Sequence, residues 1–584
     1  MINNDNALIF SSLEPSERQY EKFRAFLREK YNKEIDVAWI FTEELNKGFR
    51  LQVENDVYDW SPEGRLSQFK EALSSVSLSD GNIITLLKEK LDEFSLKALP
   101  LELGIVKSVG DGIAKVSGLE GATYGEILLF ENGIKGMVLS LTEDYAGCVL
   151  FDDDEEIKSG SKVRRTGKTA GIPVGDAFLG RAVNSLGTPI DGKGEINPSG
   201  YRLIENPAPS IVDRAPVNTP LETGILSIDS MFPIGRGQRE LIIGDRQTGK
   251  TAIAIDTIIN QKGKNCICIY VAIGQKASSV ARIVSVLEEH DALEYSVIVA
   301  ANASDSDPLL YIAPYAGCAI GEYFMEQGKD VLIVYDDLSK HAVSYRTLSL
   351  LLDRAPGREA YPGDVFYLHS RLLERSAKLN SNKGGGSITA LPIVETQAGD
   401  VSAYIPTNII SITDGQIFLE SDLFFAGQRP AVNVGLSVSR VGGDAQTKAM
   451  KKAVGTLRLE LAQYREMEVF TQFASDLDDA TRSQLNFGQS LMRMLRQDQL
   501  KPYSLPEQVC ILLAGLNHVY DEIPDDEIND FIQKLIEHLR LSISDVFMEI
   551  LSTGLLSDEN KEKIISESKK AGLEYIEKKG TLVG

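Results

Sequence analysis

The pattern of apolar and polar positions changes several times along the chain and predicts a multidomain α/β protein. From residue 171 to about 449, short apolar runs alternate with helical periodicity, as in RELIIGD before TAIAIDTIINQK and CICIYVAIG before SSVARIVSVLEEH. Strands that alternate with helices form βαβ units around a mostly parallel sheet. We therefore predict a parallel-sheet domain over residues 171–449.

The regions on either side have different patterns. Residues 99–170 contain short strand-like segments with Gly turns, such as LELGIVKSVGDGIAKVSGL and GIKGMVLSL, which predict a small antiparallel β-barrel. Residues 450–584 contain helical stretches such as MKKAVGTLRLELAQYREME and predict a helical bundle. Residues 1–75 combine the helical pattern ERQYEKFRAFLREKY with strand-like IDVAWIF and GFRLQVENDVYDW, which predicts a small α/β module. Residues 76–98 predict one more helix, either a linker or a docking helix.

Composition narrows the class of protein. The chain has 584 residues, which favours about four domains, and its formal net charge is −23. Proteins that coat nucleic acid or bind anionic membranes need basic surfaces, so we expect neither activity. Five scattered cysteines indicate a reducing compartment rather than a disulfide framework. The N-terminus lacks a signal-peptide pattern, and no apolar stretch reaches the length of a membrane span, so we expect a soluble, cytoplasmic protein.

One motif carries a specific chemistry. The segment GDRQTGKT fits G-x-x-x-x-G-K-[ST] and stands between a predicted strand and a predicted helix. Its glycines allow backbone N–H groups to face phosphates at a helix N-terminus. Lys250 would neutralise the β and γ phosphates, and Thr251 would bind Mg²⁺. The alternative, a glycine-rich turn with a solvated lysine, is disfavoured by this context. The predicted phosphate loop comprises Gly244, Asp245, Arg246, Gln247, Thr248, Gly249, Lys250 and Thr251.

Two neighbouring strands supply further residues. A phosphate-loop sheet needs an acid near the metal at the end of an adjacent strand, and VLIVYDD places Asp336 there, with Asp337 beside it. The strand CICIYVAI ends near Gln275, whose neutral amide cannot accept a proton. Some nucleotide hydrolases orient water with Gln, so this residue alone does not exclude turnover. Cys266 and Cys268 are expected to be small core residues, and the five histidines lack zinc-ligand spacing.

Residues 78–584 resemble the alpha subunits of F-type ATP synthases. The similarity lies in long ordered motifs, among them YVAIGQKAS, VYDDLSKHAVSYR, FYLHSRLLERSAKL and SVSRVGGDAQTKAMKK. It implies a RecA-like domain that binds ATP or ADP with Mg²⁺ but does not turn it over, because the catalytic beta relatives carry Glu where this chain has Gln275. It also implies three such chains alternating with three beta chains around a gamma shaft, peripheral on the cytoplasmic face of the cell membrane. The complex would make ATP from ADP and phosphate with a proton or sodium gradient.

The resemblance also implies roles for individual residues. It places two pairs near the adenine, Arg429 with Pro430 and Gln497 with Gln499. It assigns Arg440 to the catalytic site of a neighbouring beta subunit, and Ser437 to the same interface. Other positions that match family segments are Ser411, in NIISITDG, and Asp476, Asp478 and Asp479, in an acidic loop that faces the shaft.

Residues 1–75 resemble the C-terminal part of the delta subunit, which links the head to the peripheral stalk. The residues that carry this similarity are Gly48, Phe49, Arg50, Asp59, Gly64, Arg65 and Leu66. The positions expected to be buried are Phe49, Leu51, Val53, Val57, Leu66 and Phe69. An unrelated solubility or assembly extension is the alternative.

Two other functions are open at this point. A Rho-like ring ATPase shares the core but requires an RNA-binding module and basic loops, which the acidic composition disfavours. An F-type paralogue that serves a different motor assembly would keep the same motifs, and its partners would distinguish it.

Overall fold

The structure is a computed structural model. It describes residues 6–65, 101–471 and 479–580, apart from positions 43–44, 46, 54–55, 63, 132, 153–155, 522 and 525. The chain divides into two compact units, Met1–Ala170 and Gly171–Gly584, which we describe separately. Within the described ranges, no helix is both long and apolar enough to cross a lipid bilayer.

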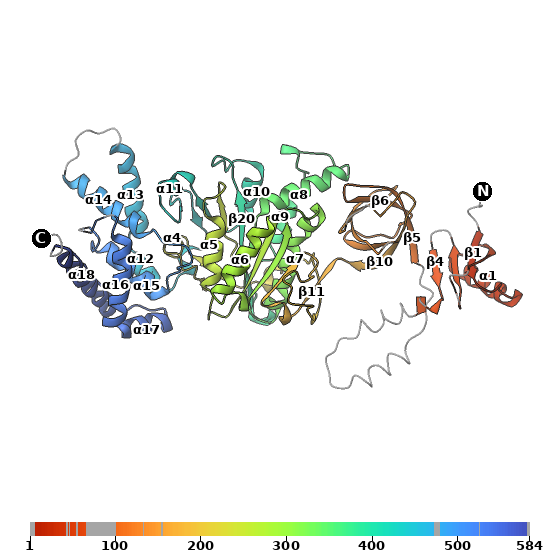
Figure 1. Ribbon diagram of the computed structural model, residues 1–584, viewed down its shortest axis with the longest axis horizontal. Coiled ribbons are helices and arrows are strands. Elements are labelled where there is room, and N and C mark those ends of the chain that lie inside the picture. Colours follow the sequence, from red (N-terminus) through yellow and green to blue (C-terminus); the bar gives the residue numbers. More distant parts are fainter. Residues whose placement is uncertain are drawn as a thin grey trace. The chain divides into compact units, whose positions relative to one another are not determined.

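The first unit begins with a small α/β module (Figure 1). Its central strand β1 pairs in parallel with β2 and antiparallel with β3, which in turn pairs with β4. Helix α1 begins with a capping box between Ser16 and Gln19 and ends at Asn32, whose φ is 53°. The elements are β1 (Asn6–Ser11), α1 (Glu17–Tyr31), β2 (Asp36–Phe41), β3 (Arg50–Val53) and β4 (Asp56–Asp59).

Helix α1 and strands β2, β3 and β4 of the module lie in the segments predicted from the sequence, and the structure adds strand β1. Strand β1 was not predicted, because a four-residue apolar run such as ALIF has no distinctive periodicity. Among the positions expected to be buried, Leu51, Val53 and Val57 are buried and Phe49 is partly buried against the same core. Leu66, Phe69 and the helix predicted over residues 76–98 lie outside the described residues.

The β-barrel prediction is confirmed. Its strands follow one another in the order β5-β6-β9-β8-β7-β10, and β10 also pairs with β5, which closes the sheet on itself. The first residues of β5, Leu101 and Glu102, pair with β4 of the module. The six strands are β5 (Leu101–Gly110), β6 (Ile113–Ser117), β7 (Glu126–Phe130), β8 (Lys135–Leu141), β9 (Ala146–Leu150) and β10 (Lys162–Thr169).

The second unit is built on a mostly parallel sheet, as predicted. Its strand order is β12-β18-β17-β19-β20-β16-β21-β22, and among the described strands of this sheet only β21 and β22 pair antiparallel. The strands are β12 (Arg181–Asn184), β16 (Leu241–Gly244), β17 (Cys266–Gln275), β18 (Ser296–Asn302), β19 (Asp330–Asp336), β20 (Ser387–Glu395), β21 (Gly415–Leu419) and β22 (Val438–Ser439). Small two-stranded sheets pair β11 (Gly171–Val174) with β13 (Gly200–Leu203) and β14 (Pro220–Leu221) with β15 (Ile234–Gly235).

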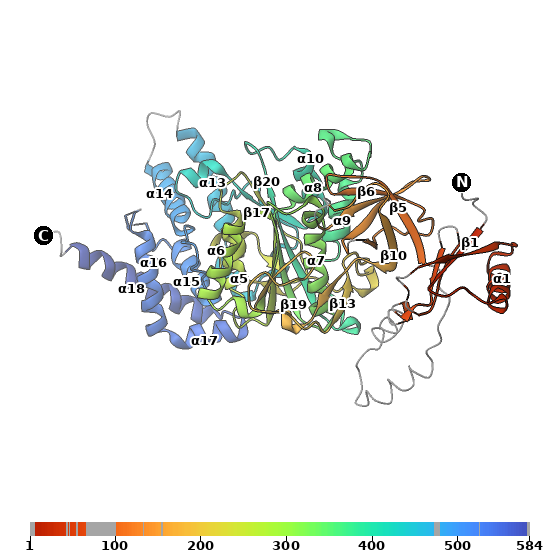
Figure 2. The ribbon, with the colours of Figure 1, turned by 45° about the vertical axis from the view of Figure 1, so that its right-hand side comes forward.

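Helices cover both faces of this sheet (Figure 2). Because side chains alternate along a strand, Cys268 and Tyr270 of β17 share one core with α5 and α6, while Val271 lies under Gly317 of α7. A Cβ at Gly317 would lie 2.4 Å from the Val271 side chain, so the small residue permits this close packing. The helices are α4 (Leu226–Met231), α5 (Lys250–Ile259), α6 (Ala277–Glu289), α7 (Asp307–Glu326), α8 (Leu338–Leu351), α9 (Val365–Leu373), α10 (Tyr404–Ile412) and α11 (Ser421–Phe425).

The C-terminal region is helical, as predicted, but its helices are shorter than the continuous patterns indicated. The pattern MKKAVGTLRLELAQYREME is interrupted at Gly455, with φ 47°, and a second helical stretch, FIQKLIEHLRLSISDVFMEILSTG, is interrupted at Ile543. Helix α15 is buried along its length and contacts α12, α14, α16, α17 and α18. The helices are α12 (Lys448–Val454), α13 (Leu457–Thr471), α14 (Asp479–Met494), α15 (Leu505–Leu516), α16 (Ile528–Ser542), α17 (Ser544–Thr553) and α18 (Asp558–Gly580).

The cysteines of the chain are all buried and unpaired. Cys266 and Cys268 of β17 lie in the core, as predicted for small core residues. Burial raises the pKa of Cys318 to about 11. The other two cysteines are Cys148 and Cys510.

Candidate nucleotide-binding site

The phosphate loop connects the end of β16 to the start of α5. Gly249 has φ 98° and Gln247 has φ 63°, conformations that turn the loop tightly before the helix begins at Lys250. The Lys250 side chain is 8% exposed and its Nζ donates to the carbonyl oxygens of Gly244, at 2.9 Å, and Asp245. Burial lowers the pKa of Lys250, and nearby carboxylates oppose that shift. A buried ammonium at a helix N-terminus is a strong site for a phosphate group.

Asp245 fixes the shape of the loop. Its carboxylate accepts hydrogen bonds from Thr396 Oγ1 at 2.6 Å, Gly399 N at 2.8 Å and Ser421 Oγ at 3.0 Å, and its carbonyl oxygen accepts one from Thr248 Oγ1 at 2.8 Å. Although burial raises the pKa of Asp245, these hydrogen bonds lower it overall. The carboxylate therefore braces the loop against β20 and α11. Sequence reasoning missed Thr396 and Ser421, since neither belongs to the motif.

Asp336 gathers three side chains at the end of β19. Its Oδ2 accepts hydrogen bonds from Thr251 Oγ1 at 2.7 Å and from Tyr270 OH at 2.6 Å, while its Oδ1 accepts one from Gln275 Nε2 at 3.0 Å. Burial raises the pKa of Tyr270 well above its usual value, so the phenol remains a donor. The structure thus brings together the two proposed Mg²⁺ ligands and Gln275, and it adds Tyr270, which the sequence analysis did not single out.

The Thr251 hydroxyl and the Asp336 carboxylate fit a Mg²⁺ ion that is bound mainly by phosphate and water. Both are hard oxygen donors beside the phosphate loop, the type that Mg²⁺ prefers. Within the described ranges, no three His, Cys, Asp or Glu residues gather in a metal-binding cluster. A protein site with few ligands of its own is typical of an ion that arrives with a nucleotide.

A cleft of about 380 Å³ opens beside the loop, and four carboxyl groups line it, among them those of Asp337 and Glu395. Asp337 caps α8 by accepting a hydrogen bond from Lys340 N at 2.8 Å, and burial raises its pKa to about 6. Glu395 lies 3.9 Å from the Arg246 guanidinium. Neither group replaces Gln275, which ends β17 with a neutral amide directed at Asp336.

The residues assigned to the adenine lie where α11 meets the C-terminal region. The Arg429 guanidinium lies over the Phe424 ring, 4.4 Å from its centroid, and the Arg429 carbonyl accepts a hydrogen bond from Gln497 N at 2.9 Å. The Gln497 side chain itself bonds backbone groups of Gly224, Leu226 and Lys501, so it holds two loops together. Pro430 follows Arg429 and is partly buried, whereas Gln499 is exposed.

Ser437 and Arg440, which the resemblance assigns to a subunit interface, flank β22, the strand at one edge of the sheet. Ser437, directly before β22, is buried and accepts a hydrogen bond from Phe418 N at 3.0 Å. Arg440, directly after β22, is exposed, and its amide donates to Asp414 O at 2.9 Å. Ser411 is exposed on α10. Asp479 is exposed at the start of α14, whereas Asp476 and Asp478 lie outside the described residues.

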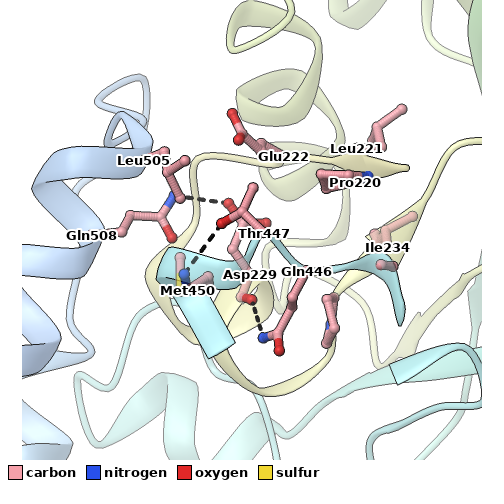
Figure 3. Close-up of a pocket in the computed structure, with 12 residues that line it drawn as sticks. Pro220, Leu221, Glu222, Asp229, Ile234, Gln446, Thr447, Met450, Leu505 and Gln508 are labelled. Atoms are coloured by element: carbon pink, nitrogen blue, oxygen red, sulfur yellow. Dashed lines mark hydrogen bonds between the residues drawn. The ribbon is translucent and has the colours of Figure 1, made fainter. Parts of the chain in front are cut away.

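A polar contact joins the nucleotide-binding region to the C-terminal helices (Figure 3). Asp229 of α4 accepts a hydrogen bond from Gln508 Nε2 of α15 at 2.8 Å, and Gln446 Nε2 donates to Asp229 O at 3.0 Å. The cavity that these residues line holds only about 20 Å³, enough for a water molecule. A second tie runs from the phosphate-loop helix, where Asp256 accepts a hydrogen bond from Leu500 N at 2.8 Å. Both contacts are structural.

Comparison with known families matches each region of the chain. Residues 224–439 match the nucleotide-binding domain of the ATP synthase alpha/beta family, residues 102–167 its beta-barrel domain and residues 446–571 its C-terminal domain. Residues 3–73 match the ATP synthase delta (OSCP) subunit.

Individual relatives agree with this assignment. The chain is 60% identical over 496 residues to ATP synthase subunit alpha of Caldanaerobacter subterraneus subsp. tengcongensis, an alignment that covers 85% of this chain and 97% of the relative. It is 58% identical over 489 residues to the same subunit of Clostridium botulinum strain Eklund 17B, covering 84% and 97%. For Acetivibrio thermocellus the values are 57% over 501 residues, covering 86% and 98%. The chain belongs to the ATP synthase alpha/beta family and carries an additional delta-like N-terminal region.

Proposed function

We propose that this chain is the non-catalytic, regulatory nucleotide-binding subunit of a rotary F-type ATP synthase. The observation that carries the proposal is Gln275, which occupies the end of β17 and donates to Asp336 at 3.0 Å. A neutral amide cannot take the proton of an attacking water, and this one is held by the acid of the metal site. Bound ATP should therefore persist.

The chain's own residues explain binding without turnover. Lys250 and the N-terminus of α5 neutralise phosphate charge, Asp245 holds the loop in shape, and Phe424 with Arg429 offers a stacked surface to the base. Thr251 and Asp336 would hold Mg²⁺, which supplies charge neutralisation at the phosphates when bound. Tyr270 keeps Asp336 oriented toward Thr251.

Arg440 is proposed to act on a different nucleotide, at the catalytic site of a neighbouring beta subunit. Its side chain is exposed at the edge of the sheet, so a second chain can reach it. A planar guanidinium stabilises the charge that develops on a transferring phosphoryl group. Ser437 supports this segment from within, through its bond to Phe418 N.

The assembly follows from the same assignment. We propose three copies of this chain alternating with three beta chains around a gamma shaft, peripheral on the cytoplasmic face of the membrane and driven by protons or sodium ions. The delta-like module, residues 1–75, would contact the peripheral stalk. Its folded sheet and core support an independent docking unit, because Leu51, Val53 and Tyr58 bury their side chains against α1 and β1.

The purified chain tests the non-catalytic assignment. We expect one MgATP bound per chain by calorimetry and no phosphate release above background, with binding weakened about 10- to 100-fold in Lys250→Ala. Lys262→Ala is a matched control, because Lys262 is 58% exposed and pairs with Asp291 outside the phosphate loop. Steady hydrolysis by the chain alone that disappears in Lys250→Ala would contradict the proposal.

A further inference from the structure

Glu240 is a buried carboxyl group that the nucleotide site does not use. It directly precedes β16 and its side chain is 0% exposed. Its Oε2 accepts a hydrogen bond from Gln238 Nε2 at 2.6 Å, whereas its Oε1 has no hydrogen-bond partner. Leaving a buried polar atom unpaired destabilises the folded state, and more so for a charged group. Such an atom calls for a physical explanation.

The Glu240 carboxyl group lies against the hairpin that carries Arg440. Gly415 of β21 pairs with Ser439 of β22, and a Cβ on Gly415 would lie 2.6 Å from Glu240 Oε2 and 2.9 Å from Oε1. Only a glycine can therefore stand between this carboxyl group and the hairpin. Gln238 Nε2, which binds Glu240, also lies 3.4 Å from Ser439 Oγ. Arg440 is the next residue along the chain.

Among the groups that act on Glu240, Arg440 supplies the attractive positive charge. Burial raises the pKa of Glu240 well above its usual value, the negative charge of Asp414 adds to this, and the Gln238 hydrogen bond and the Arg440 charge oppose it. The adjacent cation Arg239 is engaged elsewhere, since its Nε and Nη2 bind the Asp414 carboxylate at 3.0 and 2.9 Å and its Nη1 binds Glu374. Arg440 is exposed, so its guanidinium is open to groups outside the chain as well as to the charge of Glu240.

We propose that Glu240 is a positioning residue for Arg440: its ionised carboxylate draws the guanidinium back toward the chain's own sheet, and protonation of Glu240 releases Arg440 to the neighbouring subunit's nucleotide. The inference rests on the proposed role of Arg440 and adds a way in which that role is regulated. Solvent supplies the proton, and no covalent bond changes. Glu240 directly precedes β16, the strand that leads into the phosphate loop, so this charge lies next to the element that carries the chain's own nucleotide site.

Multi-site ATP hydrolysis by the head reconstituted from this chain and its beta and gamma partners, measured between pH 6 and 10, tests the inference. Ionised Glu240 competes with phosphate for Arg440, so wild-type turnover should fall as pH rises through the Glu240 ionisation. Glu240→Gln keeps the shape and an acceptor for Gln238 but not the charge. Turnover by Glu240→Gln should not show this fall with pH. At alkaline pH it should exceed wild-type turnover by up to about fivefold, the size of effect expected for a partly exposed ion pair.

Three further variants make the outcome decisive. Glu374→Gln removes a carboxylate of the Arg239 network that is not a neighbour of Arg440, and it should keep the wild-type pH phase. Glu240→Asp retracts the charge by one methylene and should shift the midpoint; this variant replaces Glu240→Gln if the latter fails to assemble, and an unchanged midpoint overturns the inference. If the pH profile of turnover for Glu240→Gln is the same as that of wild type while Arg440→Ala loses turnover, Glu240 does not position Arg440 but the proposed role of Arg440 stands. If Arg440→Ala retains turnover, both proposals fail.

Discussion

The two ends of strand β16 are built in opposite ways. At its carboxyl end, the charged groups Lys250, Asp245 and Asp336 are bonded within the chain. At its start, Glu240 has an oxygen without a partner, and Arg440 is exposed on the adjacent hairpin. At the first end, contacts within the chain fix the shape of the phosphate loop. The second end has the features expected of a shared site, in which the Arg440 guanidinium acts on a nucleotide that a neighbouring subunit binds.

The largest effect is expected from a substitution of Arg440, on the hairpin adjacent to the start of β16. Arg440→Ala in the reconstituted head should lower multi-site turnover by about a thousandfold or more, the contribution of an arginine supplied in trans. Nucleotide affinity of the chain's own site should remain unchanged by titration, because Arg440 lies at the other end of the strand. Arg440→Lys should recover little, since an ammonium lacks the planar fork. A loss of only a few fold would mean that Arg440 forms an ordinary surface ion pair.

Breaking the first end should have a smaller and different effect. Lys250→Ala removes charge-assisted hydrogen bonds to phosphate and should weaken MgATP binding by the chain about 10- to 100-fold. Thr251→Val should weaken binding only when Mg²⁺ is present, and removing Mg²⁺ with a chelator should make it equal to wild type. Calorimetry with and without the metal measures both. Equal losses in the two conditions would show that Thr251 contributes to folding of the loop rather than to the metal.

Much of this contrast could be predicted from the sequence, because motif residues are adjacent in the chain. The phosphate loop, Asp336 and Gln275 follow from strand-end positions, and the parallel sheet from alternation. Tyr270, Thr396 and Glu240 could not be predicted, since their roles depend on contacts between segments that are 66 to 201 residues apart, such as Tyr270 with Asp336 and Gln238 with Ser439. Strand β1 was missed because its apolar run is short, and the helix break at Gly455 because helical periodicity continues across it.

The tie between the phosphate-loop helix and the C-terminal region should depend on pH. Burial raises the pKa of Asp256 to about 6, from about 3.9 in an unfolded chain. Between these values the folded state holds more protons, so Asp256 makes stability fall as pH rises from about 4 to about 6. Asp256→Asn keeps an acceptor for Leu500 N and removes this penalty. Its advantage over wild type in urea unfolding should therefore grow by about 2 kcal/mol across that window.

Asp291→Asn is the control for this measurement. Asp291 is exposed, and its hydrogen bond with Lys262 lowers its pKa, so its contribution has the opposite sign. A parallel rise in both variants would indicate a general effect of net charge, and no rise in Asp256→Asn would contradict the role of the buried carboxyl.

Deleting residues 1–75 should have the smallest effect on hydrolysis. Neither end of β16 draws a residue from the module, so the head should assemble and hydrolyse ATP at the wild-type rate. Coupling to the membrane sector should weaken, which ATP synthesis in vesicles measures. Leu51→Ala, which destabilises only the module core by about 2–4 kcal/mol, should reproduce the deletion in part. Unchanged synthesis in the absence of a separate delta chain would contradict the stalk assignment.

The burial of all five cysteines has a practical consequence for these measurements. A thiol must be accessible to react with a maleimide dye, and all five of these are buried. The native chain is therefore not expected to react with the dye, which suits it to site-directed labelling. A single cysteine introduced at Val438, which is 39% exposed beside Arg440, would be the one reactive position and would place a fluorophore where a neighbouring subunit is expected to dock.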